Sequence, residues 1–410
     1  MIKRIPVERL QVGMYVQELD GPWLDHRFWR SSFKIDTAAV LRRLVGSGIR
    51  EVWIDTERGL DVTGGESRAE VDAEVDRQLA ADDAEARDEP AAGDFVPSEA
   101  ELDEAARICR RARNAVAELF RQTRLGHALD ADTVIPIVDD IAGSVARNPS
   151  VLASLSRFRH RDEYTFMHSV AVGALMISLG RRLGLDEAGL RSVGLAGLLH
   201  DIGKVSVPMA ILNKRGALTE AEFAIVRRHT QAGHHLLNHG MHVDEVVLDV
   251  CLHHHEKMNG EGYPHGLVGD AISEHARMAA ICDIYDATTS DRPYKDAWSA
   301  AKSLRRMAEW TPAYLDTRLF HALVRTVGIY PLGTLVRLKS DRLAIVVDQS
   351  EHTLLAPRVK VFHSLTSGGP LPHEIVDLSG GTEDGIVDYE DPATFGFGDL
   401  RVLWAGNIVL

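Results

Sequence analysis

The sequence predicts a mainly α protein with a small α+β domain at the N-terminus and a small β-rich module at the C-terminus. Three observations support this fold class. From about Asp130 to Gly328, apolar residues recur at helical spacing almost throughout. Residues 1–62 combine short apolar runs with one helical stretch, and residues 331–410 contain short β-branched runs separated by polar turns. With 410 residues, 45% of them hydrophobic, the chain is long enough for about two or three domains.

The N-terminal domain is predicted from alternating strand and helix patterns over residues 1–62. The runs IKRIPV, GMYV and EVWIDT indicate strands, and TAAVLRRLVGSG indicates a helix that ends at glycine. Residues 63–97 are acidic and rich in alanine, with almost no large apolar side chains, so they cannot support a core of their own. We expect this segment to be a linker in which any helix is transient.

The helical domain is predicted over residues 98–330. Ser98 and Glu101 have the spacing of a capping box, and apolar residues follow at helical spacing, which predicts a long amphipathic helix. Helical patterns continue through TFMHSVAVGALMISLGRRLG and DEAGLRSVGLAGLLHDIG. After Tyr330-Pro331 the runs TLVRLK, LAIVVD and RVKVF predict the β-rich module over residues 331–410.

Composition excludes several classes of protein. No window approaches the roughly 20 apolar residues of a membrane helix, and MIKRIPVERL lacks the apolar run of a signal peptide, so we expect a cytoplasmic protein without membrane contact. Three scattered cysteines, Cys109, Cys251 and Cys282, do not make a disulfide framework and agree with a reducing compartment. A net charge of -14 argues against a binder of nucleic acid polymers.

Potential metal ligands recur along the helical domain. His200-Asp201 ends the apolar run VGLAGLLH and precedes Lys204, although such a pair alone is equally a polar helix end that caps itself. Further candidates are His168, His229, His253-His254-His255-Glu256 and Asp283. Each one alone is more simply a structural residue. Burying all of them without a partner would cost about 1–3 kcal/mol for each unsatisfied group, whereas a metal satisfies them together.

The ligand types indicate the chemistry. Imidazoles and carboxylates without thiolates favour iron or manganese over the cysteine-rich sites of structural zinc. A carboxylate such as that of Asp201 can bridge two divalent ions about 3.5–4 Å apart, with a hydroxide between them as the nucleophile. Such a pair of ions leaves the pocket positive, so it attracts phosphate despite the acidic chain. Lys204 is placed to stabilise charge that develops on a non-bridging phosphate oxygen.

With these residues in place, the segment from about 130 to 330 resembles the HD-GYP family of the HD phosphohydrolase superfamily. The resemblance runs through HSVAVGALMISLG, LLHDIGKVSVPMAILNKRGALTEAEF, VRRHTQAGHHLL, HHEKMNGEGYPHGL and ARMAAICDIYDATTSDRPYK. It implies an HD-type helical bundle and a phosphodiesterase that hydrolyses cyclic di-GMP to pGpG, with onward cleavage to GMP left open. It also implies that Lys204 assists catalysis. The metal ligands that it implies are His168, His200, Asp201, His229, His254, His255 and Asp283.

The resemblance further implies residues that contact the substrate. Gly262-Tyr263-Pro264 matches the GYP signature, and Arg292 and Lys295 fall where the family contacts the substrate phosphates. Taken alone, the loop is a Gly-Pro turn of the kind that many helix connections use, and the two cations are ordinary surface charges. The residues before the helical domain resemble a small domain of unknown function that often precedes HD-GYP.

Two positions depart from the family pattern. Members with a third metal carry Glu one turn before the first His, where this chain has Tyr164; Asp162 and Glu163 are out of step on the helix, so we expect a binuclear site. Asn259 stands where Asp is usual, a change expected to alter loop packing or partner contact rather than metal binding. The extra imidazole of His253 is interpreted as structural.

Two alternatives stay open. The same site can act on a different cyclic dinucleotide such as cyclic GMP-AMP. In the other alternative, the chain is a catalytically weak scaffold or sensor that uses the GYP loop and the flanking domains to recruit partners such as diguanylate cyclases. The complete ligand set and Lys204 argue against the scaffold. Oligomeric state does not follow from the sequence.

Overall fold

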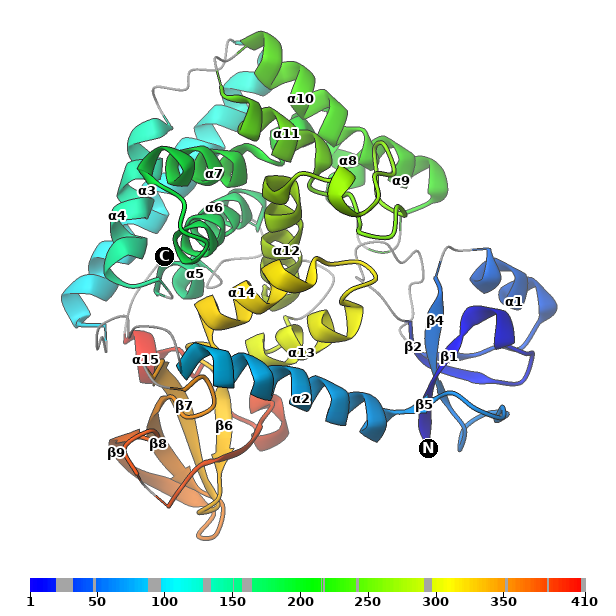
Figure 1. The fold of residues 1–410 in the computed structure, drawn as a ribbon, viewed down its shortest axis with the longest axis vertical. Coiled ribbons are helices and arrows are strands. Elements are labelled where there is room, and N and C mark those ends of the chain that lie inside the picture. Colours follow the sequence, from blue (N-terminus) through cyan, green and yellow to red (C-terminus); the bar gives the residue numbers. More distant parts are fainter. Residues whose placement is uncertain are drawn as a thin grey trace.

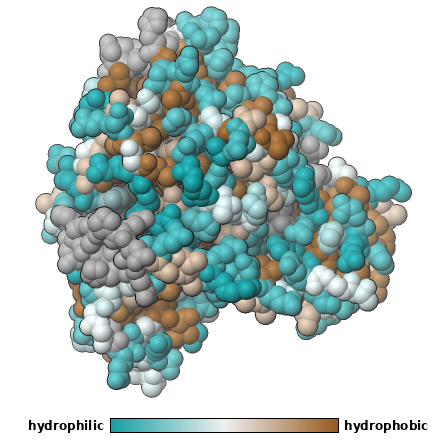
Figure 2. Space-filling model, viewed as in Figure 1, coloured by the Kyte–Doolittle hydropathy of each residue, from teal (hydrophilic) through white to brown (hydrophobic). Residues whose placement is uncertain are grey.

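A helical body has a small N-terminal sheet domain at one side and a C-terminal sheet module beneath it (Figure 1). This arrangement confirms the predicted fold class. The computed structural model describes residues 1–19, 32–46, 49–87, 97–127, 134–149, 151–156, 164–214, 216, 218–240, 243–290, 297–350, 353–381 and 383–406. On the face shown in Figure 2, hydrophilic residues cover much of the surface and hydrophobic residues form scattered groups. Among the helices of the described ranges, none combines the length and apolar character that a membrane crossing requires.

The N-terminal domain is a five-stranded antiparallel sheet in the order β3-β2-β4-β1-β5. Its elements are β1 (Ile2–Pro6), β2 (Tyr15–Leu19), β3 (Phe33–Lys34), α1 (Ala38–Val45), β4 (Glu51–Asp55) and β5 (Glu66–Ser67). Alternate strand residues such as Ile5, Val16 and Ile54 point to one face and form its buried core. Thr37 caps α1 by accepting a hydrogen bond from the Val40 amide.

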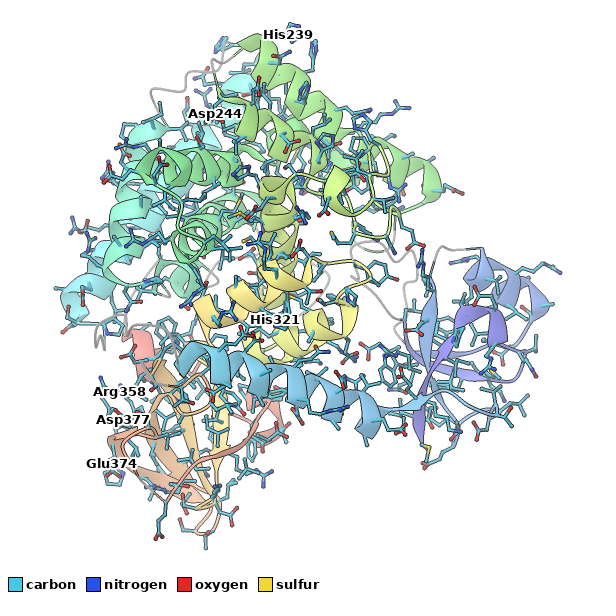
Figure 3. The ribbon with its side chains drawn as sticks, viewed as in Figure 1. His239, Asp244, His321, Arg358, Glu374 and Asp377 are labelled. Atoms are coloured by element: carbon cyan, nitrogen blue, oxygen red, sulfur yellow. The ribbon has the colours of Figure 1, made fainter. Side chains whose placement is uncertain are left out.

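The segment that was expected to be a linker contains a packed helix, α2 (Arg68–Arg87). In Figure 1, α2 runs from the N-terminal domain to the C-terminal module, beneath α13 and α14. Val75 and Leu79 lie four residues apart and pack into the main core. Asp82 accepts a hydrogen bond from His321 at 2.8 Å, beside α2 in Figure 3, and Asp83 accepts one from the Leu354 amide at 2.6 Å. Helix α2 has no core of its own. Its narrow apolar stripe packs against the helical body, and Asp82 and Asp83 bond to residues far away in the chain, so the helix is ordered.

The helical body consists of α3 to α14, and within it α6 and α7 pack closely together. Its α-helices are α3 (Glu99–Arg124), α4 (Ile135–Arg147), α5 (Val151–Ser156), α6 (Tyr164–Arg182), α7 (Glu187–Leu199), α8 (Met209–Leu212), α9 (Glu220–Arg227), α10 (His229–Gly240), α11 (Glu245–His253), α12 (Glu274–Thr289), α13 (Ala300–Trp310) and α14 (Thr317–Val327). The predicted capping box of Ser98 and Glu101 starts α3 and is confirmed. A Cβ on Gly197 would lie 2.6 Å from the Cα of Gly173, so glycine lets α6 and α7 approach closely.

The C-terminal module is a second antiparallel five-stranded sheet, in the order β10-β6-β7-β8-β9. Its elements are β6 (Leu335–Leu338), β7 (Arg342–Asp348), β8 (Arg358–Ser364), β9 (Gly369–Asp377), β10 (Ile386–Tyr389) and α15 (Val402–Ala405). Val336, Val346 and Val361 form its small core. The β-branched runs of the sequence thus supply the strands, as predicted.

Candidate metal centre

All seven residues predicted as metal ligands come together in the helical body. They form two groups, buried except for the partly exposed His255, and within each group the potential ligand atoms lie within 4.8 Å of one another. One group consists of Asp201, His229, His254 and His255, and the other consists of His168, His200 and Asp283. They come from α6, the end of α7, the start of α10, the end of α11 and α12. Residues more than 100 positions apart in the chain therefore share one site.

A glycine lets two of these elements meet. After α7 the chain forms the 3-10 turn Ile202–Ser206, which packs against α10. A Cβ on Gly203 would lie 1.9 Å from the carbonyl oxygen of His229, so any side chain at this position would push α10 away. The HDIGK sequence thus holds Asp201 within reach of His229, whose Nε2 lies 3.3 Å from Asp201 Oδ1.

Three of the imidazoles are oriented by backbone carbonyl groups. The Nδ1 atoms of His200, His229 and His254 donate to the carbonyl oxygens of Gly197, Val226 and Val250 at 2.7, 2.7 and 3.0 Å. A carbonyl oxygen only accepts, so each Nδ1 carries a hydrogen. In the neutral ring Nε2 then presents its lone pair, and in these three rings Nε2 faces the site.

This arrangement fits a bound cation. The Nε2 atoms of His229 and His254 lie 3.4 Å apart, so two lone pairs face each other. The Oδ1 atom of Asp201 is buried and accepts no hydrogen bond from any residue in the described part of the chain. Electron-pair donors facing one another in a buried site repel unless a positive charge lies between them. The donor set of imidazoles and carboxylates suits a divalent transition metal.

Asp201 has its two carboxylate oxygens directed toward different groups. Oδ1 lies 3.3 Å from Nε2 of His229 and 3.9 Å from Nε2 of His254. Oδ2 lies 3.4 Å from Nε2 of His200 and 3.8 Å from Nε2 of His168. Lys204 also donates to Oδ2 of Asp201. Asp201 is therefore shared by the two groups, as a bridging carboxylate would be.

The fourth oriented imidazole, that of His168, is held by an acid that the sequence analysis missed. Nδ1 of His168 donates to Oδ2 of the buried Asp286 at 2.7 Å, and Nε2 lies 3.0 Å from Oδ1 of Asp283. Carboxylates that hold a ligating histidine in this way fix its tautomer and raise its basicity. The available signal was the spacing of DIYD, which places Asp283 and Asp286 three residues apart on one helix face.

The environment keeps both carboxylates ionised. Burial raises the pKa of Asp201, but the nearby Lys204 and His200 outweigh burial and hold the pKa well below its usual value. Asp283 behaves in the same way, with a lowered pKa because its contact with His168 outweighs burial. Burial lowers the pKa of His168, but its bonds to acids outweigh this effect and the net pKa is raised.

The imidazoles of His254 and His255 are kept neutral. Burial, reinforced by the neighbouring imidazoles of His200 and His229, lowers the pKa of His254 to about 3. Burial also lowers the pKa of His255, with His254 as the next cause. The site at neutral pH is therefore rich in electron pairs and needs no deprotonation of these ligands before a metal binds.

The GYP loop is folded around one buried carboxylate. Glu256, a ligand-type residue in the sequence, accepts hydrogen bonds from the amides of His265, Gly266 and Leu267 at 2.7, 3.1 and 3.0 Å. Glu256 therefore anchors the loop and lies outside both groups of potential ligands. Tyr263 lies over the centre, with its ring centroid 4.8 Å from that of His255.

The loop also contacts the N-terminal domain. Arg50 donates to Oε1 of Glu261 at 2.7 Å, and Asn259 donates to Oε2 of Glu261 at 2.9 Å. Asn259 thus takes part in loop packing and lies outside the two groups. His253 also lies outside them, because its Nδ1 bonds to Asp249 at 2.7 Å and its Nε2 lies 3.0 Å from Nδ1 of His265.

Some predicted residues lie outside the described part of the chain. These are the candidate phosphate contacts Arg292 and Lys295, the acids Asp162 and Glu163, and the side chain of Tyr164. The prediction that the site holds two metal ions, and not a third, was based on residues 162–164 and stays a prediction.

Two family models match the N-terminal and the central part of the chain. Residues 2–134 match a domain of unknown function, DUF3391, and residues 145–319 match the HD domain. The chain is 49% identical over 408 residues to a cyclic di-GMP phosphodiesterase of Pseudomonas aeruginosa, covering 99% of this chain and 96% of the relative. A cyclic di-GMP phosphodiesterase response regulator of Xanthomonas campestris is 36% identical over 44% of this chain and 48% of its own length. A 3'3'-cGAMP-specific phosphodiesterase of Vibrio cholerae is 36% identical over 42% of this chain and 39% of its own length.

Proposed function

The chain belongs to the HD-GYP family of HD-domain phosphohydrolases, and on that premise we propose that it is a cyclic di-GMP phosphodiesterase that uses two divalent metal ions. The observation that carries the proposal is the buried cluster of seven ligand-type residues arranged around Asp201. Its relative from Pseudomonas aeruginosa, which is similar along nearly the whole chain, carries that activity in its name. Hydrolysis to pGpG is the proposed reaction, with GMP as a possible later product.

Each ion has a proposed set of ligands. Asp201 would serve both, because its two oxygens face different groups. The remaining ligands are His229, His254 and His255 for one ion and His168, His200 and Asp283 for the other. When bound, the two ions supply Lewis acidity toward the phosphoryl oxygens and lower the pKa of the attacking water. Neither group contains a cysteine, and this donor set supports iron or manganese. The buried Cys251 lies near the site, but its thiol donates to the carbonyl oxygen of His200.

Two further side chains are proposed to act on the substrate. Lys204 is 23% exposed and contacts Asp201, so its ammonium group can donate to a phosphate oxygen at the opening of the site. Tyr263 packs over His255, which is 18% exposed, and offers a ring against which a base or sugar can pack. The proposed roles of Arg292 and Lys295 in binding phosphate rest on the family resemblance.

The test is turnover of cyclic di-GMP by the full chain, loaded anaerobically with iron(II) or manganese(II). We expect pGpG to form in the wild type and to be absent in Asp201→Asn. The matched control is Asp244→Asn, which removes a carboxylate that caps α11 away from the centre. Wild-type protein that retains metal but hydrolyses no cyclic di-GMP with either ion would contradict the proposal.

A second substrate is favoured by one comparison. The relative from Vibrio cholerae is named for cyclic GMP-AMP and matches 171 residues of the chain. Parallel measurement of kcat/KM for both cyclic dinucleotides decides between them. A much larger value for cyclic GMP-AMP would transfer the proposal to that substrate.

Three other features stay predictions from the sequence. They are recruitment of a diguanylate cyclase through the GYP loop, a cytoplasmic location, and division of the chain into domains at residues 62, 97 and 330. The Arg50–Glu261 contact shows that the N-terminal domain already touches the GYP loop, so a partner at this loop would also meet that domain.

A further inference from the structure

Arg227 lies one aromatic ring away from the candidate metal centre. It is the last residue of α9, two positions before His229. Its guanidinium carbon lies 4.9 Å from the ring centroid of Tyr263 and 4.6 Å from that of Phe223. The same Tyr263 ring lies 4.8 Å from the His255 ring and 6.4 Å from the His229 ring. Two aromatic rings therefore flank the guanidinium, and one of them, Tyr263, also contacts the proposed ligand His255.

Within the described part of the chain, the guanidinium of Arg227 has neither a hydrogen-bond acceptor for its Nε nor a carboxylate partner. Its Nε is buried and makes no hydrogen bond there. Three other arginines share this feature at Nε, but each forms an ion pair through its terminal nitrogens: Arg277 with Asp316, Arg306 with Glu18, and Arg325 with Asp82. For Arg227 no such ion pair exists among the described residues. A half-buried cation without a counter-charge is costly unless a ligand supplies one.

We propose that Arg227 binds the phosphate of the cyclic dinucleotide that is not being hydrolysed. This inference rests on the proposed function. The planar guanidinium offers paired donors that match phosphate oxygens, and its contacts with Tyr263 and Phe223 restrict its orientation. The charge of Lys204 is partly neutralised by Asp201, whereas no described carboxylate neutralises Arg227. A cyclic dinucleotide carries two phosphates, and Arg227 adds a cation to the Lys204, Arg292 and Lys295 that are already proposed to bind phosphate.

The experiment measures nucleotide affinity in the manganese-loaded full chain. Calorimetry gives Kd for the slowly hydrolysed phosphorothioate analogues of cyclic di-GMP and cyclic di-AMP. The variants are Arg227→Gln, which removes the charge, Arg227→Lys, which keeps it, and Arg228→Gln as a control at the exposed neighbouring arginine. We expect Arg227→Gln to raise Kd for both analogues about 10- to 100-fold, the range for loss of a hydrogen bond to a charged group. Arg227→Lys should recover part of the affinity, and Arg228→Gln should match the wild type.

A second readout separates substrate contact from damage to the centre. Arg227→Gln should retain the wild-type manganese content and the wild-type kcat/KM for bis(p-nitrophenyl) phosphate, a diester with a single phosphate. Loss of manganese or of this activity would show that Arg227 acts through packing of Tyr263, and would overturn the inference.

Three further outcomes are decisive. An unchanged Kd in Arg227→Gln overturns the inference, as does absence of analogue binding by the wild type. A raised Kd for the guanine analogue alone overturns it in favour of contact with guanine, whose O6 and N7 also accept from arginine. If the wild type binds the analogues but does not hydrolyse cyclic di-GMP, the proposed function fails while the binding role of Arg227 stands.

Discussion

Asp286→Asn is expected to weaken one metal position selectively. Asp286 accepts from Nδ1 of His168 at 2.7 Å and from Ser290 Oγ at 3.3 Å, and it lies outside both groups of proposed ligands. The substitution keeps the shape of the side chain and removes its charge. His168 then loses one of the two acids that raise its pKa, so Nε2 becomes a weaker donor toward a metal.

The magnitude follows from the type of bond that is lost. Replacing a carboxylate behind a ligating histidine commonly costs 10- to 100-fold in metal affinity, which corresponds to about 1.4–2.7 kcal/mol. Only the group of His168, His200 and Asp283 contains the affected imidazole. We therefore expect one of two manganese dissociation constants to rise by about 10- to 100-fold, and the other to change little.

The assay is calorimetric titration of the metal-free protein with manganese(II). Asp249→Asn is a matched control, because Asp249 accepts from Nδ1 of His253 at the same 2.7 Å, and His253 lies outside the two groups. The control should keep both dissociation constants. Equal affinities in Asp286→Asn and the wild type, or an equal loss in both variants, would refute the positioning role of Asp286.

Three more predictions concern the loop, the cation and pH. Glu256→Gln should lower the free energy of unfolding by about 1–3 kcal/mol, because a carboxylate that accepts from three loop amides is replaced; a denaturant midpoint equal to that of the wild type would speak against this anchor. Lys204→Met should lower kcat about 10²–10³-fold with the metal content retained, and a variant with normal kcat would remove Lys204 from the mechanism. The metal-free protein should lose stability as pH falls below about 6.5. Below that pH, His254 binds a proton in the unfolded chain but not in the folded chain, where its pKa is about 3. Each pH unit therefore lowers the free energy of unfolding by about 1.4 kcal/mol for this residue. The raised pKa of His168 partly offsets this loss. Chemical denaturation in EDTA at pH 7.5 and 5.5 measures the change, and higher stability at pH 5.5 would contradict it.

The sequence was most informative where helical spacing and ligand type coincide. Apolar positions around His168 and before His200 predict buried helices, and burial of so many ligand-type side chains predicts a shared partner. The structure brings all seven residues together. The ordering of the motifs along the chain carried this prediction, since no single His-Asp pair was informative by itself.

The features that the sequence did not predict depend on partners far away in the chain. Helix α2 is acidic and has only a narrow apolar stripe, so its packing depends on α14 and on the distant donors His321 and the Leu354 amide, which bond to Asp82 and Asp83. The DIYD spacing places Asp286 on the same helix face as Asp283, but it does not reveal that Asp286 bonds to His168, 118 positions away in the chain. Glu256 has the chemistry of a ligand, but the amides of the following loop take both of its oxygens.

The most direct test adds manganese(II) stepwise to the metal-free protein and measures turnover of cyclic di-GMP at each addition. Two ions held around Asp201 predict that activity rises until two equivalents per chain have bound and then stays constant. Activity that is complete at one equivalent, or no hydrolysis at any metal content, would contradict a binuclear phosphodiesterase.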